Sequence, residues 1–87
     1  MKPKEVVGRI AASVKSMKWV PDHVRVEASS RFAEDLGFDD LDRVELVMTV
    51  EEDLGIQIPE EDLEGVETVG RLADCCIRRL AMEGGAR

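Results

Sequence analysis

The sequence predicts an all-α protein: a four-helix bundle whose third helix is short. Two observations support this fold class. Apolar residues recur three and four positions apart over most of the chain, which is the spacing of one helix face. No segment shows the strict apolar–polar alternation of a half-buried strand. The 87 residues are expected to form one domain, residues 1–87, near the lower size limit for a core without disulfides or metal.

The first helix is predicted to run from about Lys4 to Lys18. Its inner face is expected to carry Val7, Ile10, Val14 and Met17. Pro21 then breaks the helix, and the polar residues 22–30 form a long loop. Val24 and Val26 are expected to attach this loop to the core.

The second helix is predicted to begin at Asp39, after the buried anchors Phe32 and Leu36. An aspartate at a helix start accepts hydrogen bonds from the free N–H groups of the first turn, and further acids complement the helix dipole. Gly55 is expected to end the helix. The inner face is predicted to hold Val47, Val50 and Leu54, with Leu46 on its flank.

Two more helices are predicted in the last third of the chain. Pro59 occupies the favoured first-turn place of a short helical turn, and acidic residues follow it. Thr68 is expected to cap the last helix, which ends at Gly84-Gly85. The inner face of this helix is predicted to hold Val69, Leu72, Ala73, Cys76, Ile77 and Leu80.

The second helix carries a second apolar row, rotated away from its inner face: Leu41, Val44 and Met48. Two interpretations are open. Either the core extends around the helix and buries both rows, or this row stays exposed as an apolar strip. An exposed apolar strip flanked by acids is the anatomy of a docking surface for a basic partner. The flanking acids are Asp42, Glu45, Glu51 and Glu52.

The net charge of −7 is distributed unevenly along the chain. Residues 34–67 hold fourteen acidic residues and one basic residue, Arg43, whereas the remaining residues carry a net positive charge. So acidic a segment opposes binding to nucleic acid and favours a partner with a basic surface. No run of about eighteen apolar residues is present, so no transmembrane segment is expected.

The residues give no support for catalysis or for a metal site. The single histidine, His23, lies in the polar loop without a recognisable nucleophile partner. Cys75 and Cys76 are adjacent and do not make a metal site by themselves. The protein is therefore expected not to be an enzyme and to hold no metal. The N-terminus has the features of neither a signal peptide nor a transit peptide.

Several short motifs follow one another without a gap in the middle of the chain. They are Phe32-Ala33-Glu34-Asp35-Leu36-Gly37, Asp39-Asp40-Leu41-Asp42, Val44-Glu45-Leu46-Val47-Met48, Glu51-Glu52, Ile58-Pro59-Glu60 and Thr68-Val69-Gly70. Together they resemble the acyl carrier protein family. In that family the position of Asp40 is a serine, whose hydroxyl takes the 4′-phosphopantetheine arm that carries acyl groups. A carboxylate has no such hydroxyl, so no cofactor is expected on this chain, and 4′-phosphopantetheine is expected only if residue 40 is natively serine.

The resemblance implies roles for three sets of residues. Partner-facing acids are implied at Asp39, Asp42, Glu45, Glu51 and Glu52. Apolar partner contacts are implied at Leu41, Val44 and Met48. A cavity that shelters an acyl chain is implied at Phe32, Leu46, Val50, Leu54, Ile58 and Val66, for which plain core packing is the alternative. The remaining hydroxyl side chains nearby, Ser29, Ser30 and Thr49, lie away from the helix start and are not favoured as attachment sites.

Two functional hypotheses follow, and neither makes the protein an enzyme. In the first, it is a monomeric adaptor subunit that docks its acidic second helix onto a basic helical partner in a larger assembly. Members of the family are subunits of mitochondrial assemblies, where they bind small helical proteins of the LYR-motif type, so this hypothesis places the chain in the mitochondrial matrix. In the second, it is an ordinary acyl carrier whose attachment serine has been substituted by Asp40. It would then serve fatty-acid or polyketide synthesis enzymes in a bacterial cytoplasm.

Overall fold

The computed structural model describes residues 1–17, 20–21 and 23–82. These residues form four helices: α1 (Pro3–Met17), α2 (Asp40–Leu54), α3 (Glu60–Leu63) and α4 (Val69–Met82). The prediction of an all-α bundle with a short third helix is therefore confirmed. Two of the predicted helix ends, Lys18 and Gly84-Gly85, lie outside the described residues.

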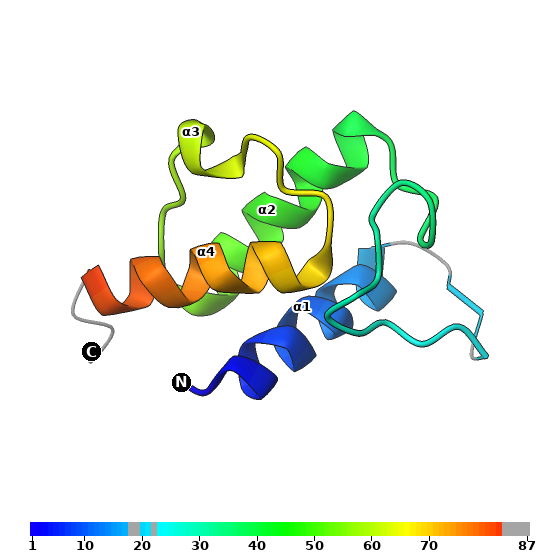
Figure 1. Cartoon of the computed structure of the whole chain (residues 1–87), viewed down its shortest axis with the longest axis horizontal. Coiled ribbons are helices and arrows are strands. Elements are labelled where there is room, and N and C mark those ends of the chain that lie inside the picture. Colours follow the sequence, from blue (N-terminus) through cyan, green and yellow to red (C-terminus); the bar gives the residue numbers. More distant parts are fainter. Residues whose placement is uncertain (18–19, 22, 83–87) are drawn as a thin grey trace.

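The direct contacts between helices link them in the order α2, α1, α4, α3. α1 contacts both α4 and α2, and α3 contacts α4. In Figure 1, α1 lies below α4, whereas α3 and the start of α2 lie above it. The long connection between α1 and α2 occupies the right-hand end of this view. The start of α2 and the whole of α3 therefore lie on the side of α4 away from α1.

The core is mainly aliphatic, with one pair of phenylalanines and both cysteines. The rings of Phe32 and Phe38 stack with centroids 6.0 Å apart. The buried apolar residues are Val6, Ile10, Val14, Phe32, Leu36, Phe38, Leu46, Val50, Ile56, Ile58, Val66, Val69, Leu72, Ala73, Cys75 and Cys76. The predicted anchors at positions 32 and 36 and the predicted contacts of Val24 and Val26 with the core are confirmed.

The predicted inner face of α1 is slightly rotated from the observed one. Val6, Ile10 and Val14 are buried, whereas Val7 and Met17 are only half-buried. Both α4 and α2 contact α1, and Val7 and Met17 pack against the edge of the core that these helices form.

The inner faces of α2 and α4 also differ in detail from the prediction. On α2, Leu46 is buried together with Val50, and it is the predicted inner residues Val47 and Leu54 that are half-buried. On α4 the predicted face is confirmed from Val69 to Cys76 and becomes half-buried at Ile77 and Leu80. Cys75 is also buried, although it was not predicted on the inner face. Its thiol donates to the backbone carbonyl of Asp62 in α3 (3.3 Å), so α3 covers this position.

The α1–α2 connection is fastened to the start of α4 by backbone hydrogen bonds. Val69 N–H donates to the Ser30 carbonyl (3.0 Å), and Gly70 N–H donates to the Ala28 carbonyl (2.8 Å). A Cβ at Gly70 would lie 2.9 Å from the Ala28 carbonyl oxygen, so only glycine permits this approach without a shift of the backbone. The loop is thereby held in place before α2 begins.

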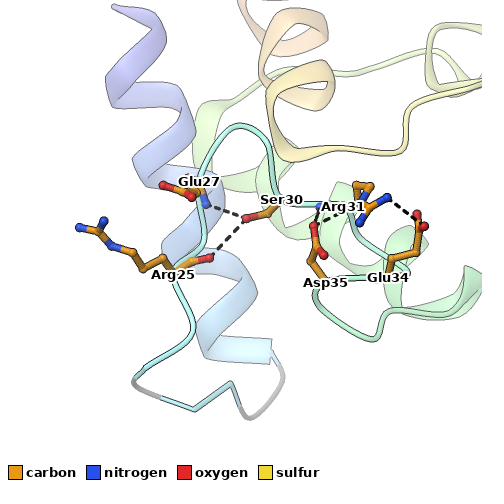
Figure 2. Close-up of polar contacts among 6 residues, drawn as sticks. All are labelled: Arg25, Glu27, Ser30, Arg31, Glu34 and Asp35. Atoms are coloured by element: carbon orange, nitrogen blue, oxygen red, sulfur yellow. Dashed lines mark hydrogen bonds and ion pairs between the residues drawn. The ribbon is translucent and has the colours of Figure 1, made fainter.

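Ser30 also organises the connection locally (Figure 2). Its hydroxyl accepts a hydrogen bond from Glu27 N–H (2.9 Å) and donates to the Arg25 carbonyl (3.3 Å). Ser30 is buried, and both capacities of its hydroxyl are used. The turn that it closes directs the chain toward the core.

Arg31 and Asp35 close the next turn (Figure 2). Arg31 N–H donates to Asp35 Oδ2 (2.8 Å), and its guanidinium Nη1 contacts Glu34 Oε2 (3.0 Å). The backbone N–H bond, more than the guanidinium, holds the pKa of the Asp35 carboxyl below its ordinary value. Arg31 also forms an isolated antiparallel bridge with Thr68. These contacts set the position from which Phe32 enters the core.

Candidate functional site

The start of α2 is a capping box made of two aspartates. Asp42 N–H donates to Asp39 Oδ1 (2.8 Å), and Asp39 N–H donates to Asp42 Oδ2 (3.1 Å). Each carboxylate thus satisfies a backbone donor that would otherwise be unpaired at the helix end. Asp40, the first helical residue, takes no part in the box and is exposed.

No side chain at this helix start has a hydroxyl group. Residues 39–42 are Asp39, Asp40, Leu41 and Asp42. Within the described part of the chain, the Asp40 carboxylate makes no hydrogen bond or ion pair, and it faces solvent at the mouth of a pocket. It can interact with positive charge near the positive end of the helix dipole, but it cannot form the phosphodiester of a phosphopantetheine arm.

The pocket lies between α2, α3 and the segment before α4. It has a volume of about 580 Å³ and is partly open to solvent. Its walls are mainly apolar and its rim carries carboxylates. The lining residues are Phe32, Asp40, Arg43, Val44, Leu46, Val47, Met48, Glu51, Ile58, Glu60, Leu63, Glu64, Val66 and Leu72.

Four of the six residues for which an acyl cavity was implied lie in this lining. They are Phe32, Leu46, Ile58 and Val66. Val50 and Leu54 do not line the pocket: Val50 is buried in the core and Leu54 is half-buried against it. Both residues belong to the core-facing side of α2, whereas their neighbour Glu51 does line the pocket.

The second apolar row of α2 is exposed. Leu41 is 66% exposed, Val44 56% and Met48 57%. Of the two interpretations of this row, the structure supports the apolar strip and excludes an extended core. Val44 and Met48 also line the pocket, so the strip and the pocket are parts of one surface.

The acids beside the apolar strip fall into two groups. Glu45 and Glu52 are exposed and point their charge into solvent. Glu51 is half-buried, and its carboxylate accepts a hydrogen bond from Ile58 N–H (2.7 Å). This bond ties the end of α2 to the segment before α3, so Glu51, expected among the partner-facing acids, also has a structural contact within the chain. Asp39 and Asp42 have their own contacts in the capping box.

Arg43 is the feature of this surface that the sequence does not single out as functional. Its guanidinium Nη2 donates to the Val66 carbonyl, which joins α2 to the segment before α4. The same residue also lines a smaller pocket of about 190 Å³, to which Glu34 and Glu67 contribute. Arg43 is the single basic residue between positions 34 and 67, and this isolation in an acidic segment is the sequence signal that could have identified it as functional.

None of the three alternative hydroxyl groups belongs to a residue that lines the pocket. The Ser30 hydroxyl is buried and hydrogen-bonded, as described above. Thr49 Oγ1 donates to the Glu45 carbonyl of its own helix (3.0 Å). Ser29 is exposed, but it belongs to the loop fastened to α4 and is not part of the pocket lining.

The two thiols are buried and free. Burial raises the pKa of the Cys76 thiol to about 12 and also raises that of Cys75. Thiols of this kind are poorly reactive because the thiolate is the nucleophile. Across the residues that the structure describes, no cluster of histidine, cysteine and carboxylate side chains is arranged to hold a metal ion. No helix in those ranges has both the length and the apolar character needed to cross a membrane.

Comparison with known proteins identifies the family. The profile of the family described as "Phosphopantetheine attachment site" matches residues 13–76. An acyl carrier protein of Thermosynechococcus vestitus is 40% identical over 82 residues, which cover 93% of this chain and 99% of that protein. This chain belongs to the acyl carrier protein family.

Other acyl carrier relatives come from organelles. A mitochondrial acyl carrier protein of Neurospora crassa is 36% identical over 74 residues, or 85% of this chain and 55% of that protein. A chloroplastic acyl carrier protein of Casuarina glauca is 38% identical over 81 residues, or 93% of this chain and 59% of that protein. This chain therefore spans little more than half the length of its organellar relatives. Because bacterial and organellar proteins are both among the relatives, they assign no single compartment.

A solved structure shares the acyl carrier fold. A chain in the crystal structure of the curacin biosynthetic pathway HMG synthase in complex with acetyl donor-ACP superimposes with a TM-score of 0.74 at 29% identity. The match covers 86% of this chain and 95% of that chain. The four-helix arrangement described above is therefore that of a known fold.

Proposed function

We propose that this acyl carrier homologue is an adaptor subunit that has no phosphopantetheine arm. It docks through α2 onto a basic helical partner, of the kind represented by LYR-motif proteins, within a larger assembly. The observation that carries the proposal is the exposed strip of Leu41, Val44 and Met48 beside the exposed acids of the same helix. Apolar contacts would supply binding energy, and the acids would orient a basic surface.

The chemistry of residue 40 supports a role other than carrying acyl groups. The family resemblance places the attachment serine at Asp40, and a carboxylate has no hydroxyl to attack the pyrophosphate of coenzyme A. The residues present at the start of α2 therefore do not fit the arm. The proposed adaptor is not an enzyme, because it offers no nucleophile or acid–base pair at this surface.

Relatives support the idea of docking without defining the partner. Mitochondrial acyl carrier proteins are among them, and we place the adaptor in the mitochondrial matrix for that reason. The solved relative is described as an acyl carrier protein in complex with a synthase, which is an example of such a domain seated on another protein. Burying an acyl chain in a partner contributes about 0.8 kcal/mol of binding free energy for each methylene. An adaptor without the arm would not gain this energy. Its surface must therefore bind by itself.

Charge reversal on α2 tests the adaptor proposal. The tagged chain is purified from its native source, and co-purifying proteins are quantified for the wild type and for the double variant Glu45→Lys/Glu52→Lys. We expect the variant to lose its specific partner, because both carboxylates are exposed and neither makes a contact that the fold needs. Glu27→Lys, an exposed acid outside residues 34–67, is the matched control and should retain the partner. Equal recovery with all three proteins would refute docking through α2.

The second candidate is an ordinary acyl carrier for fatty-acid or polyketide synthesis in which Asp40 has been substituted for serine. The cyanobacterial relative favours it, because that match spans nearly the whole of both proteins and would correspond to a bacterial cytoplasm. Asp40→Ser is the test: with coenzyme A and a phosphopantetheinyl transferase, the variant should gain the mass of the arm. The intact mass of the native protein separates the two candidates, because the bare polypeptide supports the adaptor and a modified one supports the carrier.

A further inference from the structure

We infer that the pocket beside the apolar strip receives a large apolar side chain from the docked partner. This inference rests on the proposed adaptor function and specifies how the partner is held. It reverses the direction of insertion expected of an armed carrier, in which the acyl chain leaves one protein to enter another. Here the inserted group comes from the partner and enters this chain.

The geometry of α2 makes the pocket accessible to a docked helix. Val44 and Met48 belong both to the exposed strip and to the pocket lining, and Asp40 lies in the same lining one turn before Val44. A helix that covers the strip therefore covers the mouth of the pocket as well. A side chain at the centre of such a helix would lie over this mouth, between Val44 and Met48.

The size and walls of the pocket suit an aromatic or large aliphatic side chain. Its volume of about 580 Å³ is large enough to admit a whole side chain of this kind. Leu46 and Leu72 form part of its buried floor, and Leu63 of α3 forms part of one wall. Buried aromatic anchors of this kind usually supply most of the energy of a protein interface.

The charges at the rim of the pocket determine which partner residues can flank the inserted side chain. Asp40, Glu60 and Glu64 are exposed carboxylates in the lining. The single cation of the lining, Arg43, is already hydrogen-bonded to the Val66 carbonyl. Such a rim favours lysine or arginine on either side of the apolar anchor and repels the carboxylate of a free fatty acid.

The absence of a hydroxyl at residue 40 further favours a partner side chain over a lipid. A free lipid would pay its full immobilisation cost on entering the pocket. A side chain carried by a helix already held on the strip enters at a high effective concentration. The structure therefore matches a basic amphipathic helix with one protruding apolar anchor.

Two synthetic peptides test the inference on the intact chain. Both are lysine- and arginine-rich amphipathic helices, and they differ only at the centre of the apolar face, where one carries phenylalanine and the other alanine. Binding to the wild-type protein is measured by calorimetry at low salt. We expect the phenylalanine peptide to bind about tenfold more tightly, which corresponds to burial of most of one aromatic side chain.

Filling the pocket should remove that gain. Val47 is half-buried and lines the pocket, so Val47→Phe places a ring in the space that the anchor would use. Val7→Phe is the matched control, because Val7 is also half-buried but lies on α1, outside the lining. The tenfold difference between the peptides should fall to less than about twofold in Val47→Phe and persist in Val7→Phe. Leu63→Phe replaces Val47→Phe if the latter does not fold by circular dichroism.

Each outcome separates the inference from the function on which it rests. Failure of both peptides to bind would overturn the adaptor proposal and this inference together. Equal binding of the two peptides, weakened by Leu41→Ala, would support docking on the strip and overturn insertion alone. Persistence of the gain in the filled variants would place the anchor elsewhere and overturn the inference. Binding of dodecanoate as tight as that of the phenylalanine peptide would make a fatty acid the occupant, with the same consequence.

Discussion

Helices α2 and α4 have nearly the same length and use their apolar residues in opposite ways. α4 buries five residues: Val69, Leu72, Ala73, Cys75 and Cys76. α2 buries only Leu46 and Val50, and it leaves an entire apolar row exposed. The comparison shows that α4 serves the core, whereas α2 carries more apolar surface than the core can bury. That surplus is the basis of the docking proposed above.

The strongest test of the comparison is the same truncation on both helices. Leu72 is 1% exposed and Leu41 is 66% exposed. We expect Leu72→Ala to lower the free energy of unfolding by about 2–5 kcal/mol, because it removes buried methyl groups and leaves a cavity. Leu41→Ala should change it by about 0.5 kcal/mol or less. Urea denaturation followed by circular dichroism measures both, and similar losses would show that the strip is part of the core.

A second test concerns the contact between α4 and the α1–α2 connection. Gly70→Ala brings a Cβ against the Ala28 backbone, and we expect it to cost about 1–3 kcal/mol of stability through overpacking. Gly8 of α1 is the control, since a Cβ there meets no atom within 4 Å. Gly8→Ala should stabilise the protein by about 0.5–1 kcal/mol through helix propensity. Thermal melting of the two variants in opposite directions would confirm the close approach, and a neutral Gly70→Ala would contradict it.

A third test separates the fold of α2 from the identity of residue 40. Asp39→Ala removes the side chain that caps the helix and should cost about 1 kcal/mol. Asp40→Ala removes only an exposed charge near the helix dipole and should cost less, about 0.3–1 kcal/mol. Both are measured by urea denaturation. A larger loss at position 40 than at position 39 would mean that the Asp40 carboxylate has a structural role.

The last test uses thiol reactivity and leaves the fold nearly unchanged. Met48→Cys should react with a thiol reagent at the rate of a free cysteine, whereas Cys75 and Cys76 should remain protected until the chain unfolds. Mass spectrometry of the native protein measures this labelling. Because burial raises the pKa of the Cys76 thiol, the contribution of the protonated thiol to the stability of the fold is complete below pH 9.0 and is lost as the pH rises toward about 12. Rapid modification of both native thiols would contradict the burial of α4.

Helical spacing and capping residues were sufficient to predict the number and order of the helices. The capping aspartate at position 39 and Gly55 after the helix define α2, and Gly55 has the left-handed backbone (φ 68°) that glycine favours. The phase of an inner face was harder to predict. Val6 and Val7 are both apolar, and their spacing alone does not say that Val6 is buried and Val7 half-buried.

The candidate site was predicted in part. The second apolar row and the acids beside it follow from the sequence of α2 alone, whereas the structure was needed to show that the row is exposed. The contacts of Glu51 with Ile58 and of Arg43 with Val66 do not, because they join residues that are 7 and 23 positions apart and depend on how the chain turns after α2. The pocket was likewise not predicted, because α3 forms part of its wall and the position of α3 relative to α2 does not follow from the apolar spacing within either helix.

The uneven distribution of charge along the chain also affects the rate at which a partner associates with it. The acids of residues 34–67 lie on α2, α3 and their flanking segments, whereas eleven of the twelve bases lie outside residues 34–67, six of them on α1 and α4. This separation gives the molecule a permanent electric moment. In the field of a basic partner, the moment rotates the molecule during diffusion so that α2 faces the partner before contact. Salt would then slow the rate of association far more than it would speed dissociation.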